Sequence, residues 1–183
     1  MNLQEEKNNP AEYTDENGEE EYRSELSENM AALKNLPIFS GIPYEIIRLF
    51  AYTAVRKVFS AGDRVFRQGE MSKDAYLILS GKVRLYIRAH QKSFPLQVLE
   101  AKDFFGYMAL LAQYEWPLSC RVLEDTEILL LERESFRKIL TKFPEKCILV
   151  AERLVQMRMK RMKEHMQVLM EEREGMEKIG NMF

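Results

Sequence analysis

The sequence has few of the residues that build catalytic and metal sites. Its 183 residues include only two histidines, His90 and His165, and two cysteines, Cys120 and Cys147. A metal site needs several His, Cys or carboxylate ligands close together, and no Ser-His-Asp pattern or phosphate-binding glycine loop is present either. We therefore expect a protein that is not an enzyme, has no catalytic residues, and needs no metal or other cofactor. Two separate cysteines predict free thiols.

Long apolar runs are also missing. No run approaches the ~18 to 20 residues that span a bilayer. The N-terminus has neither the basic stretch nor the apolar segment of a signal peptide. These absences predict a cytoplasmic protein that does not enter a membrane.

Charge is distributed unevenly along the chain. The net charge is -2, yet the first 30 residues contain ten acidic residues against Lys7 and Arg23, so they carry -8 and the remainder carries +6. Residues 1–24 also lack apolar periodicity, which predicts a disordered acidic arm. This arm either packs against the mildly basic body, tethers a partner or keeps the protein in solution. Charge alone does not favour nucleic-acid binding.

The body is predicted to span residues 25–143, with helices followed by strands. Apolar residues at helical spacing start after Ser24 or Ser27 and stop at Pro37, and a second helix follows Pro43. From Ala54 the period becomes two, with turns at glycines. The expected strands cover 55–59, 65–66, 76–79, 83–87, 96–99, the surroundings of residue 122, and 128–131. Because no helices of crossover length separate them, we predict an antiparallel barrel or roll.

The last segment, residues 144–183, is predicted to be a long helix that mediates dimerisation. From Met159 its apolar residues are spaced by three and four, a narrow seam that needs a partner helix, for which a second copy of the chain is the economical choice. The methionines either make this interface adaptable or simply fill a coiled coil. The expected interface residues are Ile148, Ala151, Val155, Met159, Met162, Met166 and Leu169.

Four motifs in this order resemble the cyclic-nucleotide-binding domain family, which includes Crp/Fnr-type effector domains, kinase regulatory subunits and gated channels. The motifs are AGDRVFRQGE (61–70), AYLILSGKVRLY (75–86), DFFGYMALL (103–111) and ILLLERESFRKIL (128–140). The resemblance covers residues 36 to about 165. It implies a mainly β fold, a double-stranded β-helix (jelly roll or β-roll), with N-terminal helices and a long C-terminal helix.

In that family the ligand binds a cassette that reads F-G-E-[aliphatic]-A-L and, a few residues later, P-R-[ST]-A. Its Glu accepts a hydrogen bond from the ribose and its Arg neutralises the cyclic phosphate. This chain has Tyr107 in place of the Glu and Leu118 in place of the Arg. The resemblance assigns ligand-binding positions to Phe105, Gly106, Tyr107, Met108, Ala109, Leu118, Ser119 and Cys120.

The two replacements predict weak binding of cyclic nucleotides. Hydrogen bonds to charged groups contribute about 1.5 to 3 kcal/mol each, so losing both would reduce affinity by ~10² to 10⁴. Arg121 is not expected to compensate, because residues 118 and 121 point to opposite faces of a strand. The sequence does not tell whether Arg64, Arg67 or Arg84 does. The pocket then either accepts an apolar or weakly polar effector or is filled by its own side chains.

These features predict a regulatory or sensor module that acts through ligand- or partner-dependent positioning of the C-terminal helix. Its expected partners are a second copy, with a protein partner or a small effector left open. The alternative is a Crp/Fnr-type effector domain, without its helix-turn-helix, that still binds a cyclic nucleotide or another effector. Direct DNA binding is not expected, because only five residues follow Lys178, although Arg158, Lys160, Arg161 and Lys163 form a basic cluster. A further alternative is redox sensing through Cys120.

Overall fold

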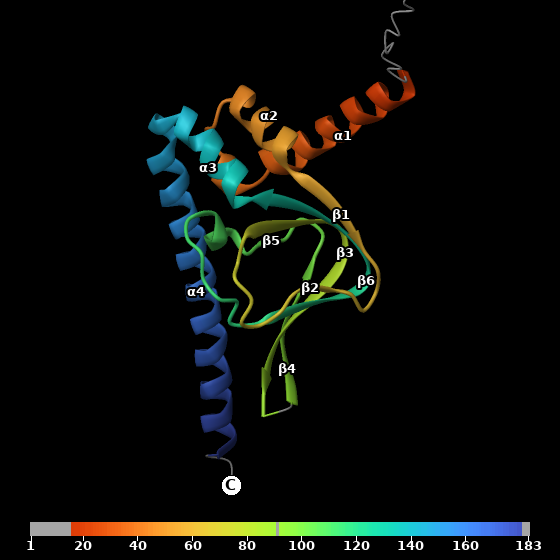
Figure 1. Cartoon of the computed structure of the whole chain (residues 1–183). Helices are drawn as coiled ribbons and strands as arrows, with labels where there is room; N and C mark the ends of the chain where they lie inside the picture. The colour runs from red at the N-terminus through yellow and green to blue at the C-terminus, as the bar shows by residue number, and fades with distance from the viewer. Residues whose placement is uncertain (1–15, 91, 181–183) are drawn as a thin grey trace, which may run out of the picture.

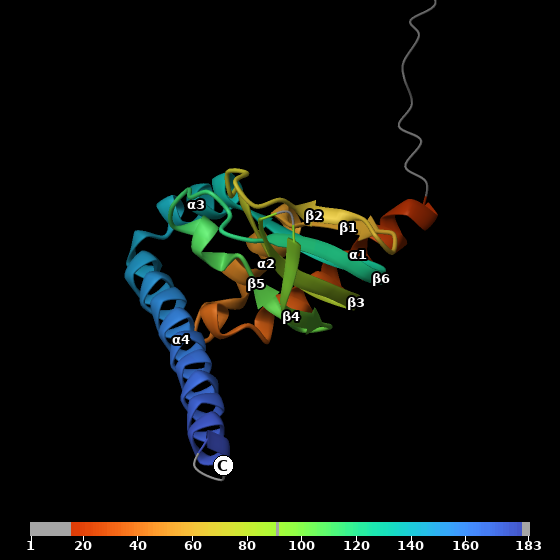
Figure 2. The same ribbon diagram turned by 90° about the horizontal axis from the view of Figure 1, so that it is seen from below.

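The computed structural model describes residues 16–90 and 92–180. Helices lie at one end of a β-roll, and a long C-terminal helix runs along the side of the roll and beyond it (Figures 1 and 2). The element order is α1, η1, α2, six strands with a short 3₁₀ helix η2 among them, α3 and α4. The predicted class, mainly β with flanking helices and a long C-terminal helix, is confirmed.

The N-terminal helix is longer than the sequence indicated. Helix α1 spans Glu16–Lys34, so the prediction that it starts at Ser24 or Ser27 is wrong, as is disorder for residues 16–24. Acidic side chains near a helix N-terminus interact favourably with the helix dipole. Farther along, Tyr22 packs edge-on against Tyr52, with ring centroids 6.4 Å apart. Residues 1–15 of the predicted arm lie outside the described residues.

The short elements η1 (Pro37–Phe39) and α2 (Tyr44–Thr53) follow. Helix α2 begins directly after Pro43, as predicted, whereas η1 begins at Pro37, where the sequence predicted only the end of the first helix. Arg56, in the strand β1 (Val55–Phe59), holds α1 to the roll. Its guanidinium forms ion pairs with Glu28 at 2.9 Å, with Glu127 at 3.0 Å and with Glu25 at 3.6 Å. The arrangement ties α1 to the first strand and to the last one.

The sheet contains β1 (Val55–Phe59), β2 (Arg64–Phe66), β3 (Asp74–Ala89), β4 (Lys92–Glu100), β5 (Phe104–Phe105) and β6 (Ser119–Glu132). Its main path is β1-β6-β3-β4, β2 pairs with β6, β5 pairs with β3, and all pairs are antiparallel. The antiparallel roll is therefore confirmed. The expected strands 76–79 and 83–87 are one strand, as are those near 122 and 128–131, because register shifts let both strands continue through their irregular points.

Two C-terminal helices complete the chain. Helix α3 (Arg133–Lys142) leads to α4 (Pro144–Gly180), whose 37 residues correspond to about 55 Å. Val150 and Leu154 of α4 are fully buried in the helical core, and Arg153 donates from Nη1 to the Pro37 carbonyl at 3.1 Å. The first part of α4 is thus fixed to the body. Among the described residues, no helix is both long and apolar enough to cross a bilayer.

Candidate functional site: the cassette pocket

The cassette follows β5 as a tight turn and a short helix. Gly106 has φ of +70° and is followed by η2 (Tyr107–Leu110). A Cβ atom at Gly106 would lie 2.8 Å from the Trp116 ring, so the backbone conformation and the close approach both require glycine. The Phe-Gly pair of the sequence therefore fixes the start of η2 against the roll.

The returning segment of the cassette is held by the Gly69-Glu70 turn. Gly69 N donates to the Trp116 carbonyl and Trp116 N donates to the Glu70 carbonyl, both at 2.8 Å. Gln68 N donates to Ser119 Oγ at 3.0 Å. These bonds connect two motifs that are about 50 residues apart in the sequence and set the position of Leu118 between them.

A cavity of about 350 Å³, called the cassette pocket below, lies between the cassette, the roll and α4. Aromatic side chains fill part of the space beside it, where the Phe66 and Trp116 rings stack with centroids 4.0 Å apart. The pocket that remains is mostly apolar. Its lining residues are Phe66, Leu85, Phe105, Gly106, Tyr107, Met108, Tyr114, Trp116, Pro117, Leu118, Arg158 and Arg161.

The structure brings five of the eight expected cassette residues to this pocket, namely Phe105, Gly106, Tyr107, Met108 and Leu118. The other three do not line it. Ala109 and Cys120 are fully buried. The Ser119 hydroxyl accepts a hydrogen bond from Gln68 N. Their role is to support the cassette rather than to face its cavity.

Cys120 is a free thiol, as is Cys147, which confirms the prediction from spacing. Burial raises the pKa of the Cys120 thiol to about 12, so the thiolate that reacts with oxidants is scarce at neutral pH. The redox alternative therefore loses its physical basis in this conformation.

Two arginines of α4 reach the pocket, and sequence reasoning missed both. The sequence groups Arg158 and Arg161 with Lys160 and Lys163 in one basic cluster and does not link them to the cassette. Instead, Arg161 donates from Nη2 to the Phe104 carbonyl at 2.9 Å and lies over the Tyr107 ring, 5.6 Å from its centroid. Burial raises the pKa of Tyr107, and these two arginines oppose the shift. Their spacing of three along α4 was the available signal, but it does not tell which side of the helix meets the cassette.

The other arginines that might replace the missing cassette Arg lie elsewhere. Arg64, Arg84 and Arg121 line a separate hollow, and Arg67 borders a third one. Arg121 thus lies away from the cassette pocket, as its position relative to Leu118 predicted. The question left open for Arg64, Arg67 and Arg84 is answered in the same way: none of them lines the cassette pocket.

Helix α4 has two apolar seams. The inner seam contacts the helical core through Cys147, Val150, Leu154 and Met157 and continues to Arg161. The outer seam comprises most of the expected interface residues, and the exposed fractions of their side chains are 72% for Ile148, 49% for Val155, 53% for Met159, 43% for Met162 and 50% for Met166. Ala151 is partly exposed, and the side chain of Leu169 lies outside the described residues.

Known proteins share the fold described above. Residues 56–143 match the family model of the cyclic nucleotide-binding domain. This part of the chain belongs to the cyclic nucleotide-binding domain family. Among the described residues, no three His, Cys, Asp or Glu side chains are grouped in a way that would hold a metal ion.

Two curated proteins are similar to this chain over part of their length. The chain is 34% identical over 134 residues to the cyclic AMP receptor protein of Thermus thermophilus, a match that covers 72% of this chain and 60% of that protein. It therefore spans less than two thirds of that relative. A cAMP-dependent protein kinase regulatory subunit of Emericella nidulans is 26% identical over 111 residues, which are 60% of this chain and 26% of the subunit.

Solved structures show the same fold. The Thermus thermophilus catabolite activator protein superposes with a TM-score of 0.62 at 32% identity, covering 73% of this chain and 62% of that one. A cyclic nucleotide-binding-like protein of Brucella abortus gives a TM-score of 0.58 at 28% identity, covering 62% of this chain and 98% of that one. The expected β-roll family is thus confirmed.

Proposed function

We propose that this chain is a non-enzymatic regulatory module of the cyclic nucleotide-binding domain family that does not bind cAMP or cGMP tightly. The observation that carries the proposal is the pair Tyr107 and Leu118, which line the cassette pocket where the family places a carboxylate and a guanidinium. Among the described residues, none that lines the pocket carries a carboxylate to accept from a ribose hydroxyl. The cassette therefore does not fit a cyclic nucleotide, and no cofactor is assigned to it.

The charges that do reach the pocket come from α4 and are arranged differently from a phosphate site. Arg161 is already bonded to the Phe104 carbonyl and packed over Tyr107, so binding a phosphate would disrupt existing contacts. The rest of the wall is largely aromatic and aliphatic. A small, mostly apolar effector fits this lining, and a single acidic group on it would be favoured by the guanidinium groups.

Occupancy of the pocket is coupled to the position of α4 in this proposal. The cassette side contributes Tyr107 and Met108, while α4 contributes Arg158 and Arg161. An effector bound between these walls shifts α4 from one position to another only if its contacts differ between the two positions. The same helix carries the exposed outer seam, so a shift of α4 would be transmitted to whatever binds that seam.

The proposed occupant of the outer seam is a second copy of the chain. Apolar residues at Ile148, Val155, Met159, Met162 and Met166 leave a stripe exposed on a helix whose inner seam is already packed. A narrow stripe at heptad spacing is typical of a coiled coil. We keep the cytoplasm as the expected location and no direct DNA contact as the expected behaviour.

Isothermal titration calorimetry with cAMP and cGMP tests the ligand proposal. We expect no low-micromolar binding by the wild-type chain, and such binding would overturn the proposal in favour of an effector domain that has kept its nucleotide. The variant Y107E/L118R restores both family residues and is expected to gain about 10² to 10⁴ in affinity. As a control, V58E adds a carboxylate at an exposed position of β1 and should gain nothing.

The oligomeric state tests the seam. Light scattering after size-exclusion chromatography should give a dimer for the wild-type chain and a monomer for M159E/M166E, because charges are placed inside the seam. The control Q156E/Q167E adds two negative charges at exposed polar positions of the same helix and should remain dimeric. A monomeric wild-type chain would rule out the homodimer.

A further inference from the structure

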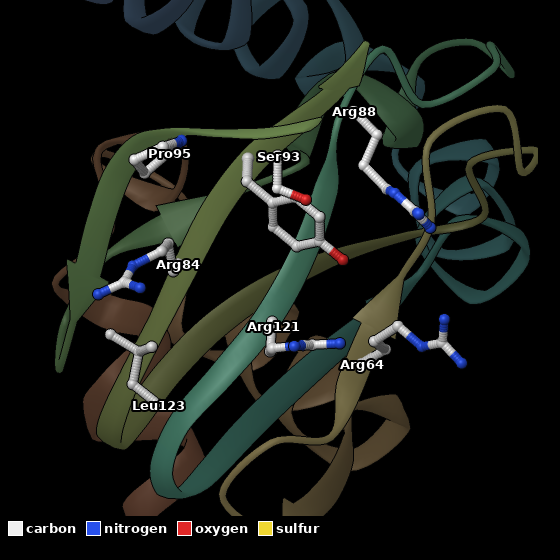
Figure 3. A pocket seen from close by; sticks show the side chains of 8 residues that line it. Arg64, Arg84, Arg88, Ser93, Pro95, Arg121 and Leu123 are labelled. Carbon is white, nitrogen blue, oxygen red and sulfur yellow. The ribbon is translucent and has the colours of Figure 1, made fainter. Parts of the chain in front are cut away.

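A second hollow lies on the outer face of the roll, away from the cassette pocket. It has a volume of about 370 Å³ and is lined by strands β2, β3, β4 and β6 (Figure 3). Four of its lining residues are arginines, Arg64, Arg84, Arg88 and Arg121, and we call it the arginine hollow. Tyr86, Ser93, Pro95 and Leu123 complete the lining.

Three of these arginines form a row across adjacent strands. Arg121 of β6 is the direct partner of Arg64 in β2 and of Arg84 in β3. Like charges that face each other directly across strands destabilise a sheet. In Figure 3 the side chains of Arg64, Arg88 and Arg121 extend to one side, and Arg84 extends to the other. The like-charge pairs of this row therefore cost folding free energy, and all three residues are exposed.

The positive charge of the hollow is not neutralised within the described part of the chain. None of the four guanidinium groups has a carboxylate within ion-pair distance there, whereas Arg56 on the same sheet has three. The chain contains 29 acidic residues, so a shortage of acids does not explain the difference. An uncompensated cluster of this kind is what an anion-binding site requires.

We propose that the arginine hollow binds a small molecule that carries an oligophosphate group. Guanidinium forks bind phosphate oxygens in a bidentate manner, and those of Arg64, Arg88 and Arg121 extend to one side of the hollow, where a phosphate chain can contact all three (Figure 3). The hydroxyl groups of Tyr86 and Ser93 add two further donors. The volume of about 370 Å³ lies in the range of small-ligand sites.

This site is separate from the cassette pocket and does not depend on the function proposed for it. Arg64 and Phe66 are two residues apart, which would place them on one face of a regular strand. A register shift between them instead pairs Arg64 with the exposed Arg121 and Phe66 with the buried Cys120. The bulge thus directs Arg64 into the hollow and Phe66 towards the cassette pocket.

Titration of the full chain with inorganic tripolyphosphate at physiological salt tests the proposal. We expect saturable binding that R64Q and R121Q each weaken by roughly 10- to 100-fold, corresponding to one lost charged hydrogen bond. The control R137Q removes the same charge from an exposed position of α3 and should leave the affinity unchanged. Because all three side chains are exposed, we expect circular dichroism to show that the variants remain folded.

Titrations with other ligands and variants distinguish a nucleotide from a phosphate chain alone and define the results that overturn the proposal. ATP that binds tighter than tripolyphosphate, with the same loss in R121Q, supports a nucleotide, and equal binding supports the phosphate chain alone. The proposal is overturned if tripolyphosphate does not bind, if sulfate at equal ionic strength displaces it, or if R137Q weakens it as much as R121Q does. It is also overturned if R158Q, in the cassette pocket, abolishes binding while R64Q and R121Q do not. Tighter binding of duplex DNA than of tripolyphosphate, lost in the same variants, would reassign the hollow to nucleic acid.

Discussion

Two rows of residues cross strands β2, β6 and β3 next to each other and face opposite sides of the roll. The inner row is Phe66, Cys120 and Leu85, and the outer row is Arg64, Arg121 and Arg84. The inner row packs beside the cassette pocket, while the outer row lines the arginine hollow. One sheet thus separates an apolar cavity from a cationic one. In these rows, residues on the inner face of the sheet are apolar and residues on the outer face are cationic, even where the two are neighbours in the sequence.

Exchanging neighbours between the rows should have the largest effect. The double variant C120R/R121C places a guanidinium at a fully buried position, where an unpaired charge has no partner. We expect a loss of more than about 4 kcal/mol in the free energy of unfolding, measured by urea denaturation. The single variant R121C removes the like-charge contacts with Arg64 and Arg84, so it should not lower the free energy of unfolding. Similar stabilities for the two variants would mean that the faces are not distinct.

A smaller effect is expected from a methyl group at the entrance to the inner cavity. G106A places a Cβ atom 2.8 Å from the Trp116 ring at φ of +70°, whereas G62A has φ of +92° and nothing within 4 Å. Left-handed backbone costs both variants about 1 to 2 kcal/mol, and overpacking adds about 1 to 3 kcal/mol at Gly106 alone. Urea denaturation of both measures the difference. Equal losses would show that Trp116 moves freely.

The contact between α4 and the cassette should contribute less. R161Q removes the hydrogen bond to the Phe104 carbonyl, and we expect a loss of about 1 kcal/mol because the side chain is only partly buried. R158Q, which removes an exposed charge from the same pocket, should change stability by less than about 0.5 kcal/mol. Equal effects in chemical denaturation would contradict the position assigned to Arg161.

The smallest effect is expected in the outer row. R84Q removes one like-charge contact, so it should raise the free energy of unfolding by about 0.2 to 1 kcal/mol at low salt. The gain should shrink at high salt as the charges are screened. R137Q serves as the control, since Arg137 lies on α3 outside the row. A gain in R84Q that does not respond to salt would point to packing instead of charge.

Much of the fold was predictable because its signals are local. The change of period at Ala54 and the prolines Pro43 and Pro144 located the start of the strands and the starts of α2 and α4. The start of α1 was predicted wrongly because its first turns are acidic and lack apolar periodicity. Tyr22 of α1 contacts Tyr52 of α2, and no local pattern predicts a contact between two helices.

The sequence by itself determined the family, the antiparallel roll and the replacements Tyr107 and Leu118, since these follow from the order and spacing of motifs. Only the tertiary structure decided which arginines meet which cavity. Arg161 reaches the cassette because the inner seam of α4 packs on the helical core. Arg64 faces outward because a bulge, set by pairing with β6, breaks the two-residue period of its own strand. Both outcomes depend on contacts between segments distant in sequence, and local periodicity carries no information about them.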